Sequence, residues 1–416
     1  MSKSENIRPI KPSEASKVLR RCFRKKRSAF LWGPPGIGKS AIIFQIADED
    51  SPRDEAGEMI EDKRVAVYDV RLLLMEPTDL RGMPRVAPGE DVMRWTAPSV
   101  LPPMYLEVRE RDGETFTIDN IKTRADLAAA YGKVVERIPN ERKSILFLDE
   151  LTAAPTSLQA AAYQLVHDRR IGDYVLPDGC AVVAAGNRQS DRGVAYKMPT
   201  PLRNRFTHFE MQHDYQDWAV WAIGARVNPF VIAYLEEKRS DLFRFDPTSE
   251  DVAFPTPRSW EFVSNYMDDA DEDPLEDHLL TQMVAGAIGI GVTSEFMAHR
   301  EFARDLPKVR DILSGKAKKM NTKNTSAQFF LSAALCYAMS DAYKEASQKG
   351  KQADFNEMTE NYFTFIMANF KRELVVMSVR AALKNHKIQF QTSKLKAWNT
   401  FYDQYGSLVA EAIHMN

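Results

Sequence analysis

The chain has 416 residues, which at roughly 100 to 200 residues per domain predicts two or three domains with cores of their own. Hydrophobic residues make up 44% and charged residues 27%, so the composition disfavours disordered, collagen-like and disulfide-scaffold classes. The formal net charge of −2 lacks the overall basicity that most dedicated nucleic-acid binders use.

Cysteine usage and hydropathy indicate the compartment. Cys22, Cys180 and Cys336 lie far apart, so they form no zinc-ligand spacing, and their odd number argues against a secreted disulfide framework. The longest apolar run, near Met283 to Val292, is about half the roughly 18 residues that a membrane span requires. A cytoplasmic protein with no membrane segment is therefore expected.

The first 27 residues are predicted to form a helix that ends in a basic run, Arg20 to Arg27. One interpretation is a surface that contacts nucleic acid or the acidic groups of a partner. The other is a solvated helix end whose cations complement the helix dipole. Both stay open at this point.

A phosphate-binding loop follows. Ser28 to Trp32 is a short apolar run, Gly33 to Ser40 matches GxxxxGK[ST] in full, and Ala41 to Ala47 has helical composition. In this strand–loop–helix order, backbone N–H groups and the helix N-terminus surround phosphates, Lys39 reaches the β- and γ-phosphates and Ser40 ligates Mg²⁺. The residues expected around the nucleotide are Gly33, Pro34, Pro35, Gly36, Ile37, Gly38, Lys39 and Ser40.

The next hundred residues are predicted to decorate the core. Asp69 to Pro103 is rich in Pro and Gly and carries Met93 and Trp95, which suggests a projecting insert. Its apolar residues either grip a substrate or pack on the insert itself. Further on, Asp112-Gly113 predicts a hairpin turn, and residues 124–135 are expected to be helical.

A second part of the site is expected at the end of a buried strand. Ser144 to Leu148 is continuously apolar, which is typical of a parallel strand covered on both faces, and Asp149 and Glu150 follow it. Asp149 suits Mg²⁺ coordination, and Glu150 suits polarising an attacking water. Acids at strand ends also cap helices, but the matched phosphate loop favours one shared site.

A third apolar strand, Cys180 to Ala185, leads to Asn187, whose amide can hold water or the γ-phosphate without adding charge. Pro201 to Phe206 places two arginines on a short, helical segment, and Arg258 stands at a predicted helix start. Taken singly, Asn187 is also ordinary turn chemistry and each arginine is also an ordinary surface residue.

After Met211 the strand signals fade. Tyr215 to Arg239 and Ser259 to Met267 are predicted helices, and a domain boundary is expected near residues 212–250. From Ser326 to Asn416, apolar residues recur at three and four positions, which predicts a helical extension without a recognised motif.

The seven histidines show no HExxH or paired-ligand spacing, so no structural metal is expected. His208 and His213 are expected to flank a strand. No nucleophile elbow occurs. Nucleotide hydrolysis is therefore the one enzymatic activity that the sequence predicts.

In order, the motifs GPPGIGKS, ILFLDE, AAGN, PLRNRF and TPRSW resemble the Walker A, Walker B, sensor 1, arginine-finger and sensor 2 motifs of an AAA+ ATPase. Glu76 to Pro84 and His167 to Gly179 resemble the helix-2 insert and pre-sensor hairpin of the MoxR branch, and Leu279 to Gly315 resembles its lid. The resemblance covers about residues 10 to 315. It implies a ring, usually a hexamer, with ATP and Mg²⁺ bound between subunits and with the inserts facing the pore.

The same resemblance assigns roles to single residues. It implies that Arg205 is the arginine finger for the neighbouring subunit's γ-phosphate, with Arg203 as the reserve candidate. Asn187 takes the sensor 1 role and Arg258 the sensor 2 role, either within its own subunit or across the interface. Asn204 stands where the MoxR pattern more usually has aspartate.

The expected fold class is α/β: a P-loop NTPase core of the AAA+ type with a parallel sheet, an all-helical lid and a helical C-terminal extension. We expect the core with its insert and hairpin over residues 1–212, the lid over 213–318 and the extension over 319–416. By family likeness, the work is chaperone-like remodelling or maturation of a partner protein, commonly one with a von Willebrand A-type domain.

Two other functions remain open. One is a nucleic-acid-directed AAA+ motor of the restriction or replication type, with the basic run as its footprint; the near-neutral charge weighs against it. The other is a regulatory switch that hydrolyses ATP too slowly to do work, against which the complete set of acids, sensors and finger weighs.

Overall fold

The computed structural model describes residues 8–54, 58–60, 63–86, 89, 91–111, 114–118, 133–191, 196–268, 275–301, 306–321, 324–390 and 395–413. The chain divides into two compact units, Met1–His213 and Asp214–Asn416. Each unit is built around its own buried residues.

The first unit holds a five-stranded sheet in the order β12-β1-β11-β8-β2, and all of its strand pairs are parallel. Because parallel strands end at the same edge, the loops that follow β1, β8 and β11 converge there. The main elements of this unit are α1 (Pro12–Arg24), β1 (Ala29–Trp32), α2 (Lys39–Asp50), β2 (Ala66–Arg71), η2 (Leu72–Leu74), α3 (Pro77–Arg81), β8 (Ser144–Asp149), α5 (Thr156–Asp168), β11 (Cys180–Gly186), η3 (Gln189–Asp191), α6 (Thr200–Arg203) and β12 (Thr207–Glu210).

Both faces of the sheet are covered, which explains the continuous apolar runs of its strands. In β8, Leu146 and Leu148 pack in one cluster with Leu158 and Leu165 of α5. Residues between them along the strand point to the other face, and Phe147 there is also fully buried. This arrangement confirms the predicted class of an α/β P-loop core with a parallel sheet.

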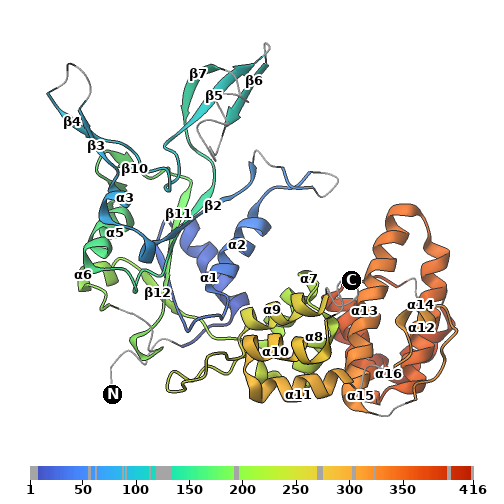
Figure 1. Ribbon diagram of the computed structural model, residues 1–416. Coiled ribbons are helices and arrows are strands. Elements are labelled where there is room, and N and C mark those ends of the chain that lie inside the picture. Colours follow the sequence, from blue (N-terminus) through green and yellow to red (C-terminus); the bar gives the residue numbers. More distant parts are fainter. Residues whose placement is uncertain are drawn as a thin grey trace. The chain divides into compact units, whose positions relative to one another are not determined.

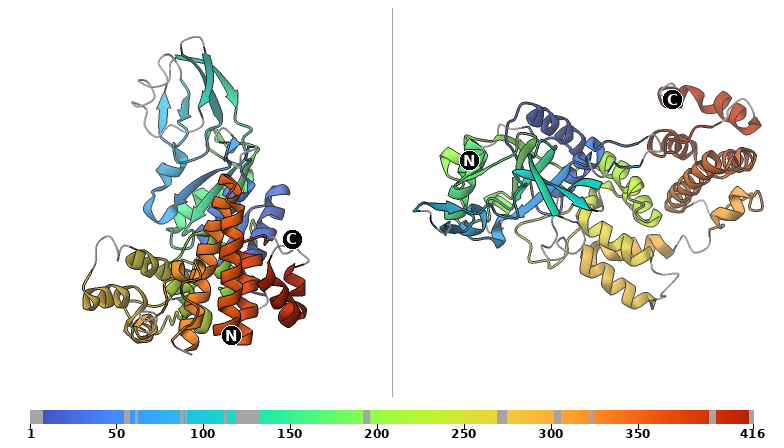
Figure 2. Two further views of the ribbon diagram at one scale, coloured as in Figure 1. Left: turned by 90° about the vertical axis from the view of Figure 1, so that its right-hand side faces the viewer. Right: turned by 90° about the horizontal axis from the view of Figure 1, so that it is seen from above.

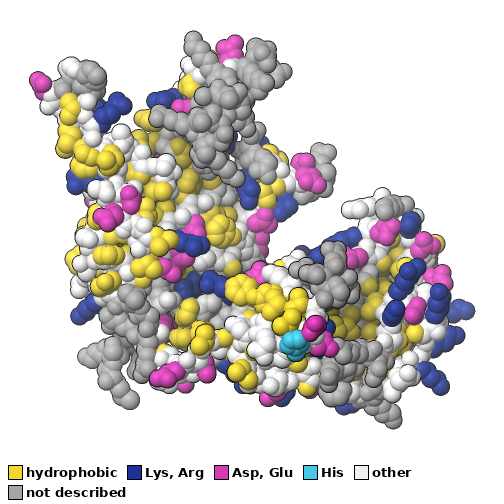
Figure 3. Space-filling model, in the orientation of Figure 1, with side chains coloured by type: hydrophobic (Ala, Val, Ile, Leu, Met, Phe, Trp, Pro, Cys, Tyr) yellow, Lys and Arg dark blue, Asp and Glu magenta, His cyan; other side chains and the backbone are white. Residues whose placement is uncertain are grey.

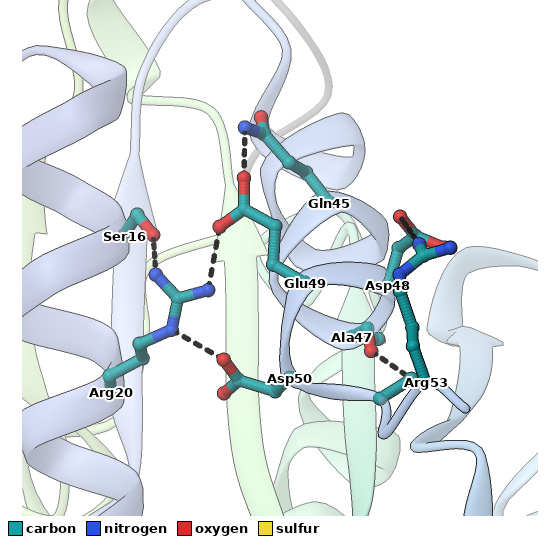
Figure 4. A network of polar contacts seen from close by, with 9 residues as sticks. Ser16, Arg20, Gln45, Ala47, Asp48, Glu49, Asp50 and Arg53 are labelled. Atoms are coloured by element: carbon teal, nitrogen blue, oxygen red, sulfur yellow. Dashed lines mark hydrogen bonds and ion pairs between the residues drawn. The ribbon is translucent and has the colours of Figure 1, made fainter. Parts of the chain in front are cut away.

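The predicted N-terminal helix is present as α1, and its basic run is partly used inside the unit. The Arg20 guanidinium binds Glu49 at 2.7 Å and Asp50 at 2.8 Å, both at the end of α2, and donates to the Ser16 hydroxyl (Figure 4). The five further cations of the run are all exposed: Arg21, Arg24, Lys25, Lys26 and Arg27. The first cation of the run therefore joins two helices of the core.

Three small antiparallel sheets decorate this core (Figure 1). The predicted hairpin is present as β5 and β6, although its two turn residues lie outside the described residues. Most of the helix predicted for residues 124–135 also lies outside them, and its last three residues belong to strand β7 instead. The strands are β3 (Pro84–Val86), β4 (Met93–Trp95), β5 (Tyr105–Arg111), β6 (Glu114–Ile118), β7 (Lys133–Pro139), β9 (Arg170–Ile171) and β10 (Tyr174–Val175).

Hairpin β3–β4 is anchored at one end and exposes apolar side chains beside the paired Arg85 and Arg94. Trp95 stacks under the Arg81 guanidinium at 4.2 Å, and its backbone N–H donates to Asp173 between β9 and β10 at 2.7 Å. Hydrophobic side chains are exposed along the hairpin (Figure 3), including Met83, Val86, Val92 and Met93. Trp95 therefore fits the interpretation that the apolar residues pack within the protein. The other four side chains are exposed, as the interpretation of a substrate grip requires.

The described part of the second unit is helical. The predicted helix 215–239 is two helices, because Asn228 caps a new helix that begins at Pro229. The long helices α13 and α14 lie side by side (Figure 2). The elements are α7 (Tyr215–Gly224), α8 (Pro229–Glu237), η4 (Arg239–Leu242), α9 (Pro257–Asp268), α10 (Asp277–Ile288), α11 (Ile290–Glu301), α12 (Val309–Leu313), α13 (Thr325–Lys349), α14 (Gln352–Asn369), α15 (Arg372–Arg380), η6 (Ala381–Asn385) and α16 (Lys396–Ile413).

Two hydrophobic clusters make the core of this unit. One surrounds the buried Trp260 and Phe296 of the earlier helices, and the other surrounds Phe363 and Phe401 of the later ones. Between α7–α8 and α13–α15 lies a cavity of about 440 Å³, with Tyr337 and His386 among its lining residues. None of the described helices is both long enough and apolar enough to span a membrane.

Candidate nucleotide-binding site

The phosphate loop follows β1 directly and turns on two glycines in left-handed conformations. Gly36 has φ 78° and Gly38 has φ 92°, values that a side chain with a Cβ rarely adopts. Gly38 is also the N-cap of α2 and offers no side-chain acceptor to that helix. The first N–H groups of α2 are therefore available to an anion, and the positive end of the helix dipole faces the loop.

Lys39 is the first residue of α2, and its side chain folds back over the loop. Its Nζ donates to the carbonyl oxygens of Gly33 at 2.6 Å and Pro34 at 2.9 Å, and to Asn187 Oδ1 at 2.9 Å. The last contact joins residues 148 positions apart, since β1 and β11 are neighbours in the sheet. The ammonium group is thus held where oxygen atoms converge, which is the environment that phosphate oxygens would also provide.

Ser40 and Asp149 meet across α2 and β8. The Ser40 hydroxyl donates to Asp149 Oδ2 at 3.1 Å. A hydroxyl and a carboxylate facing each other supply oxygen ligands only, which suits Mg²⁺, an ion that keeps several waters and takes few protein ligands. Within the described residues no group of three or more His, Cys, Asp or Glu side chains is arranged as a metal site. Because Ser40 and Asp149 both offer oxygen, this donor pair fits Mg²⁺ better than a transition metal that prefers nitrogen or sulfur ligands.

Asp69 is a residue of this edge that the sequence did not single out. Strand β2 pairs with β8 so that Arg71 lies opposite Asp149, which brings the Asp69 carboxylate close. Burial, and then the negative charge of Asp149, raise the pKa of Asp69, while Arg71 at 3.6 Å opposes the shift. Two carboxylates that repel each other favour a cation between or beside them. The sequence held one sign of this residue, because Asp69 is an acid within the otherwise mostly apolar segment Ala66–Val70.

Glu150 follows Asp149 in an unusual backbone conformation. Its φ is 55°, in the left-handed region, where non-glycine residues are uncommon and are concentrated at functional sites. Its backbone N–H donates to Asp149 Oδ1 at 2.9 Å, and the residue is exposed. The strand end therefore turns so that one acid points at Ser40 and the next remains open to water.

Asn187 is positioned by a residue that has no motif. The Thr152 hydroxyl, buried in the loop after β8, donates to the Asn187 carbonyl oxygen at 3.1 Å. Gly186 makes this approach possible, since a Cβ there would lie 2.4 Å from the Thr152 hydroxyl oxygen. The loops after β8 and β11 are thus locked together, and the Asn187 side chain is directed at Lys39.

The two candidate finger arginines differ in their surroundings. Arg203, at the end of α6, is exposed. Arg205 is half-buried and its Nη2 donates to the Tyr163 hydroxyl of α5 at 3.4 Å. Its Nε is buried, without a hydrogen-bond partner among the described residues. Arg205 therefore contacts the core of its own subunit, whereas the Arg203 side chain is exposed to solvent.

Arg258 lies in the second unit, at the start of α9, as the sequence predicts. Thr256 and Ser259 exchange hydrogen bonds that cap the helix, at 2.7 Å and 3.1 Å. Trp260, fully buried, donates its indole N–H to the Asp241 carbonyl at 2.8 Å. These contacts fix the first turn of α9 and leave the Arg258 side chain exposed.

No protein-family model matches the sequence, and no curated protein matches it. Among solved structures, the chain is similar to a RuvB mutant from Thermotoga maritima, at 16% identity over 80% of this chain and 74% of that one, with a TM-score of 0.28. A protein described as an ATPase from Cytophaga hutchinsonii shares 12% identity over 97% and 88%, with a TM-score of 0.29. NtrX from Brucella abortus shares 12% over 75% and 64%, with a TM-score of 0.32. At such low identities and TM-scores, these likenesses do not decide the function of the chain.

Proposed function

We propose that the chain is an Mg²⁺-dependent ATPase of the AAA+ superfamily and of its MoxR branch. The observation that carries the proposal is the convergence, at one edge of a parallel sheet, of Lys39 with Asn187 and of Ser40 with Asp149. Three segments far apart in the sequence supply these four side chains: the start of α2, the end of β8 and the residue after β11. A chance glycine-rich turn would not bring the acid and the amide of two other strands to its own lysine and serine.

Each side chain has a part that follows from its place. Ser40 and Asp149 would hold Mg²⁺, which when bound supplies positive charge to the phosphates. Lys39 neutralises negative charge that develops on the γ-phosphate, and Asn187 holds the Lys39 ammonium in place. Glu150, exposed beside Asp149, orients the attacking water.

The resemblance of the motifs to those of AAA+ ATPases supports a proposal for the oligomeric state. The chain forms a ring, in the proposal a hexamer, in which Arg205 reaches the ATP of the neighbouring subunit and Arg203 is the reserve candidate. Arg258 senses the nucleotide from the lid. Hydrolysis removes a contact that bridges two subunits, and this differential contact shifts the lid against the core.

The work that we propose is remodelling of a partner protein in the cytoplasm, with a von Willebrand A-type domain protein as the expected partner. The exposed hydrophobic side chains of hairpin β3–β4 support a polypeptide substrate, because unfolded or extended chains offer apolar groups to grip. The pairing of Arg20 with Glu49 and Asp50 removes one cation from the footprint that a nucleic-acid motor would use.

The first test separates binding from hydrolysis. Lys39→Ala should abolish ATP binding, because the ammonium is the positive charge at the centre of the loop. Glu150→Gln should bind ATP and stop turnover, because only the orientation of water is lost. Isothermal titration with ATP and Mg²⁺, and a phosphate-release assay, measure the two effects. Equal loss of ATP affinity in both variants would overturn the assignment.

The second test identifies the client. Glu150→Gln, purified from its own cytosol in ATP, should retain a protein partner, since the trapped state holds its client longest. Lys39→Ala, purified in parallel, is the matched control that should retain none. ATP turnover of the unmodified protein should stay flat when polynucleotide is added. A salt-sensitive rise in turnover would instead favour the nucleic-acid motor.

A further inference from the structure

Four aromatic side chains connect the strand of the phosphate loop to the arginine segment, defined here as residues 203–206. Phe30 and Trp32 lie in β1, and Trp32 directly precedes Gly33. His208 lies inside β12 and not beside a strand, contrary to the sequence prediction. The Phe30 and Phe206 rings meet edge to face with centroids 5.5 Å apart, and the Trp32 and His208 rings stack at 5.9 Å.

Two hydrogen bonds run through His208. The Trp32 indole N–H donates to His208 Nδ1 at 3.0 Å, and His208 Nε2 lies 2.7 Å from the carbonyl oxygen of Arg203. The indole nitrogen can only donate, so Nδ1 carries no proton. The ring proton is therefore on Nε2, which donates to the Arg203 carbonyl.

The surroundings keep the ring in this neutral form. Burial lowers the pKa of His208, and the positive charge of Arg203 lowers it further, while the bond to the Arg203 carbonyl opposes the shift. A doubly protonated ring would turn an N–H of Nδ1 toward the N–H of Trp32. The Trp32 indole thus fixes the tautomer of His208 that is protonated on Nε2, and this N–H can then donate to the Arg203 carbonyl.

The arginine segment also has anchors that do not involve His208: Arg205 donates to the Tyr163 hydroxyl of α5, and the N–H of Thr207, the next residue, donates to the Ser28 carbonyl just before β1. Its backbone N–H groups bond within the turn, from Asn204 to Thr200 and from Arg205 to Leu202. Contacts that tie the turn to β1 come from the Arg203 carbonyl, through His208, and from the Phe206 ring, through Phe30. These two anchors lie on either side of Arg205.

We propose that His208 is a positioning residue, which ties the arginine segment to the strand that carries the phosphate loop of its own subunit. Each subunit would then hold the arginine that it offers to its neighbour in a fixed position relative to its own phosphate loop. This second step rests on the proposed function. The first step, the anchoring itself, concerns only contacts inside one unit.

Three variants separate the contacts. His208→Phe keeps a ring in the aromatic cluster and removes both hydrogen bonds. His208→Gln keeps an N–H donor that can reach the Arg203 carbonyl, and is the conservative variant. Trp32→Phe leaves His208 in place and removes only the donor that fixes its tautomer.

Hydrogen exchange measured by mass spectrometry on the full chain tests the anchoring without any activity. In His208→Phe, the amides of residues 203–206 should exchange about tenfold faster, because their turn loses an anchor to the sheet. In His208→Gln they should stay near the unmodified protein. Unchanged exchange in His208→Phe, or equal loosening in His208→Gln, would overturn the proposal. If the amides of α5 also exchange faster in His208→Phe, the substitution has disturbed more than the anchor, and Trp32→Phe is then the deciding variant. Faster exchange in Trp32→Phe that is confined to residues 203–206 supports the anchor, and unchanged exchange overturns it.

Turnover tests the link to the neighbouring subunit. His208→Phe should lower kcat about tenfold, as expected for a displaced catalytic group, with KM for ATP unchanged, and His208→Gln should recover most of the loss. Mixing His208→Phe with Lys39→Ala subunits should restore part of the activity, since the intact finger then comes from the neighbour. Absence of recovery would overturn the link. If the unmodified protein hydrolyses no ATP while the exchange result holds, the proposed function fails and the anchoring stands.

Discussion

At the scale of single residues, the site is defined by side chains that hold one another before any nucleotide is considered. Lys39 binds Asn187 and Ser40 binds Asp149, so each element of the site is oriented by another. Asn187 is itself held by Thr152 through its backbone carbonyl. Such mutual support is what keeps catalytic groups within a fraction of an ångström of a working geometry.

Asn187→Ala tests this support. The variant removes the side-chain oxygen partner of the Lys39 ammonium on β11's loop and leaves its bonds to the Gly33 and Pro34 carbonyls in the phosphate loop. We expect kcat for ATP to fall about 100-fold, at the lower end of the loss when one preorganised polar group of a site is removed, while ATP affinity changes little. Steady-state kinetics and titration measure both. Asn399→Ala, at an exposed position of α16, is the control, and an equal effect there would contradict the role of Asn187.

At the scale of elements, helix α1 is joined to α2 by charge. Arg20 contacts Glu49 and Asp50, whose side chains are 45% and 38% exposed, so water screens the pairs and limits their contribution. The bond of Arg20 to Ser16 within α1 adds a third contact. The run Arg20 to Arg27 is thus partly structural, and its first residue differs in role from the exposed cations that follow.

Arg20→Gln should lower the free energy of unfolding by about 0.5–1.5 kcal/mol, a range set by two partly exposed ion pairs made by one guanidinium. Arg24→Gln, on the same helix and exposed, should change it by less than about 0.5 kcal/mol. Urea unfolding followed by circular dichroism measures the difference, which should shrink in 1 M salt, where the Debye length is about 3 Å. Equal effects of the two variants would show that Arg20 is an ordinary surface cation.

The π-helical turn η6 leads to a half-buried histidine. His386 meets the Tyr337 ring edge to face at 5.2 Å. Burial, and then the charge of Lys344, lower the pKa of His386 to about 4, against the opposing charge of Asp341. The unfolded chain, with a histidine pKa of about 6.5, takes up this proton first as the pH falls, so acid favours unfolding.

We therefore expect stability to fall between pH 6.5 and pH 4, with a contribution from His386 of about 2 kcal/mol between pH 7 and pH 5. Urea unfolding at the two pH values measures it. His386→Gln should flatten this part of the pH dependence, whereas His278→Gln, at an exposed position, should leave it unchanged. A pH dependence of the same slope in all three proteins would contradict a neutral His386.

At the scale of the whole molecule, the proposed ring requires each subunit to complete the site of another. The exposed Arg203 and the half-buried Arg205 are the candidates for this contact. Arg205 contacts Tyr163 in its own core, so in the proposal it exchanges that contact for the phosphate of the neighbour. Arg203 would need no such exchange.

Mixing subunits distinguishes the two arginines. Arg205→Ala and Lys39→Ala should each be inactive alone and should partly recover ATP turnover when mixed, because a mixed interface then combines an intact loop with an intact finger. Arg203→Ala is tested in the same way as the matched alternative. Recovery with Arg203→Ala and none with Arg205→Ala at any ratio would transfer the finger role to Arg203.

The sequence by itself determined which motifs of the site are present and in which order they follow along the chain. A phosphate loop between a strand and a helix, an apolar strand ending in Asp149 and Glu150, and an apolar strand ending before Asn187 predicted a parallel α/β core, because local patterns of hydropathy and glycine are enough to mark strands and turns. These strands are present within a residue of their predicted ends.

Only the tertiary structure decided which side chains meet. Asp69 and Thr152 carry no motif, yet strand pairing and loop packing bring them to Asp149 and Asn187. His208 was expected beside a strand and lies within one, where its register opposite Phe30 places it over the arginine segment. Contacts of this kind join residues up to 176 positions apart. They depend on strand order and register, which a local pattern does not contain.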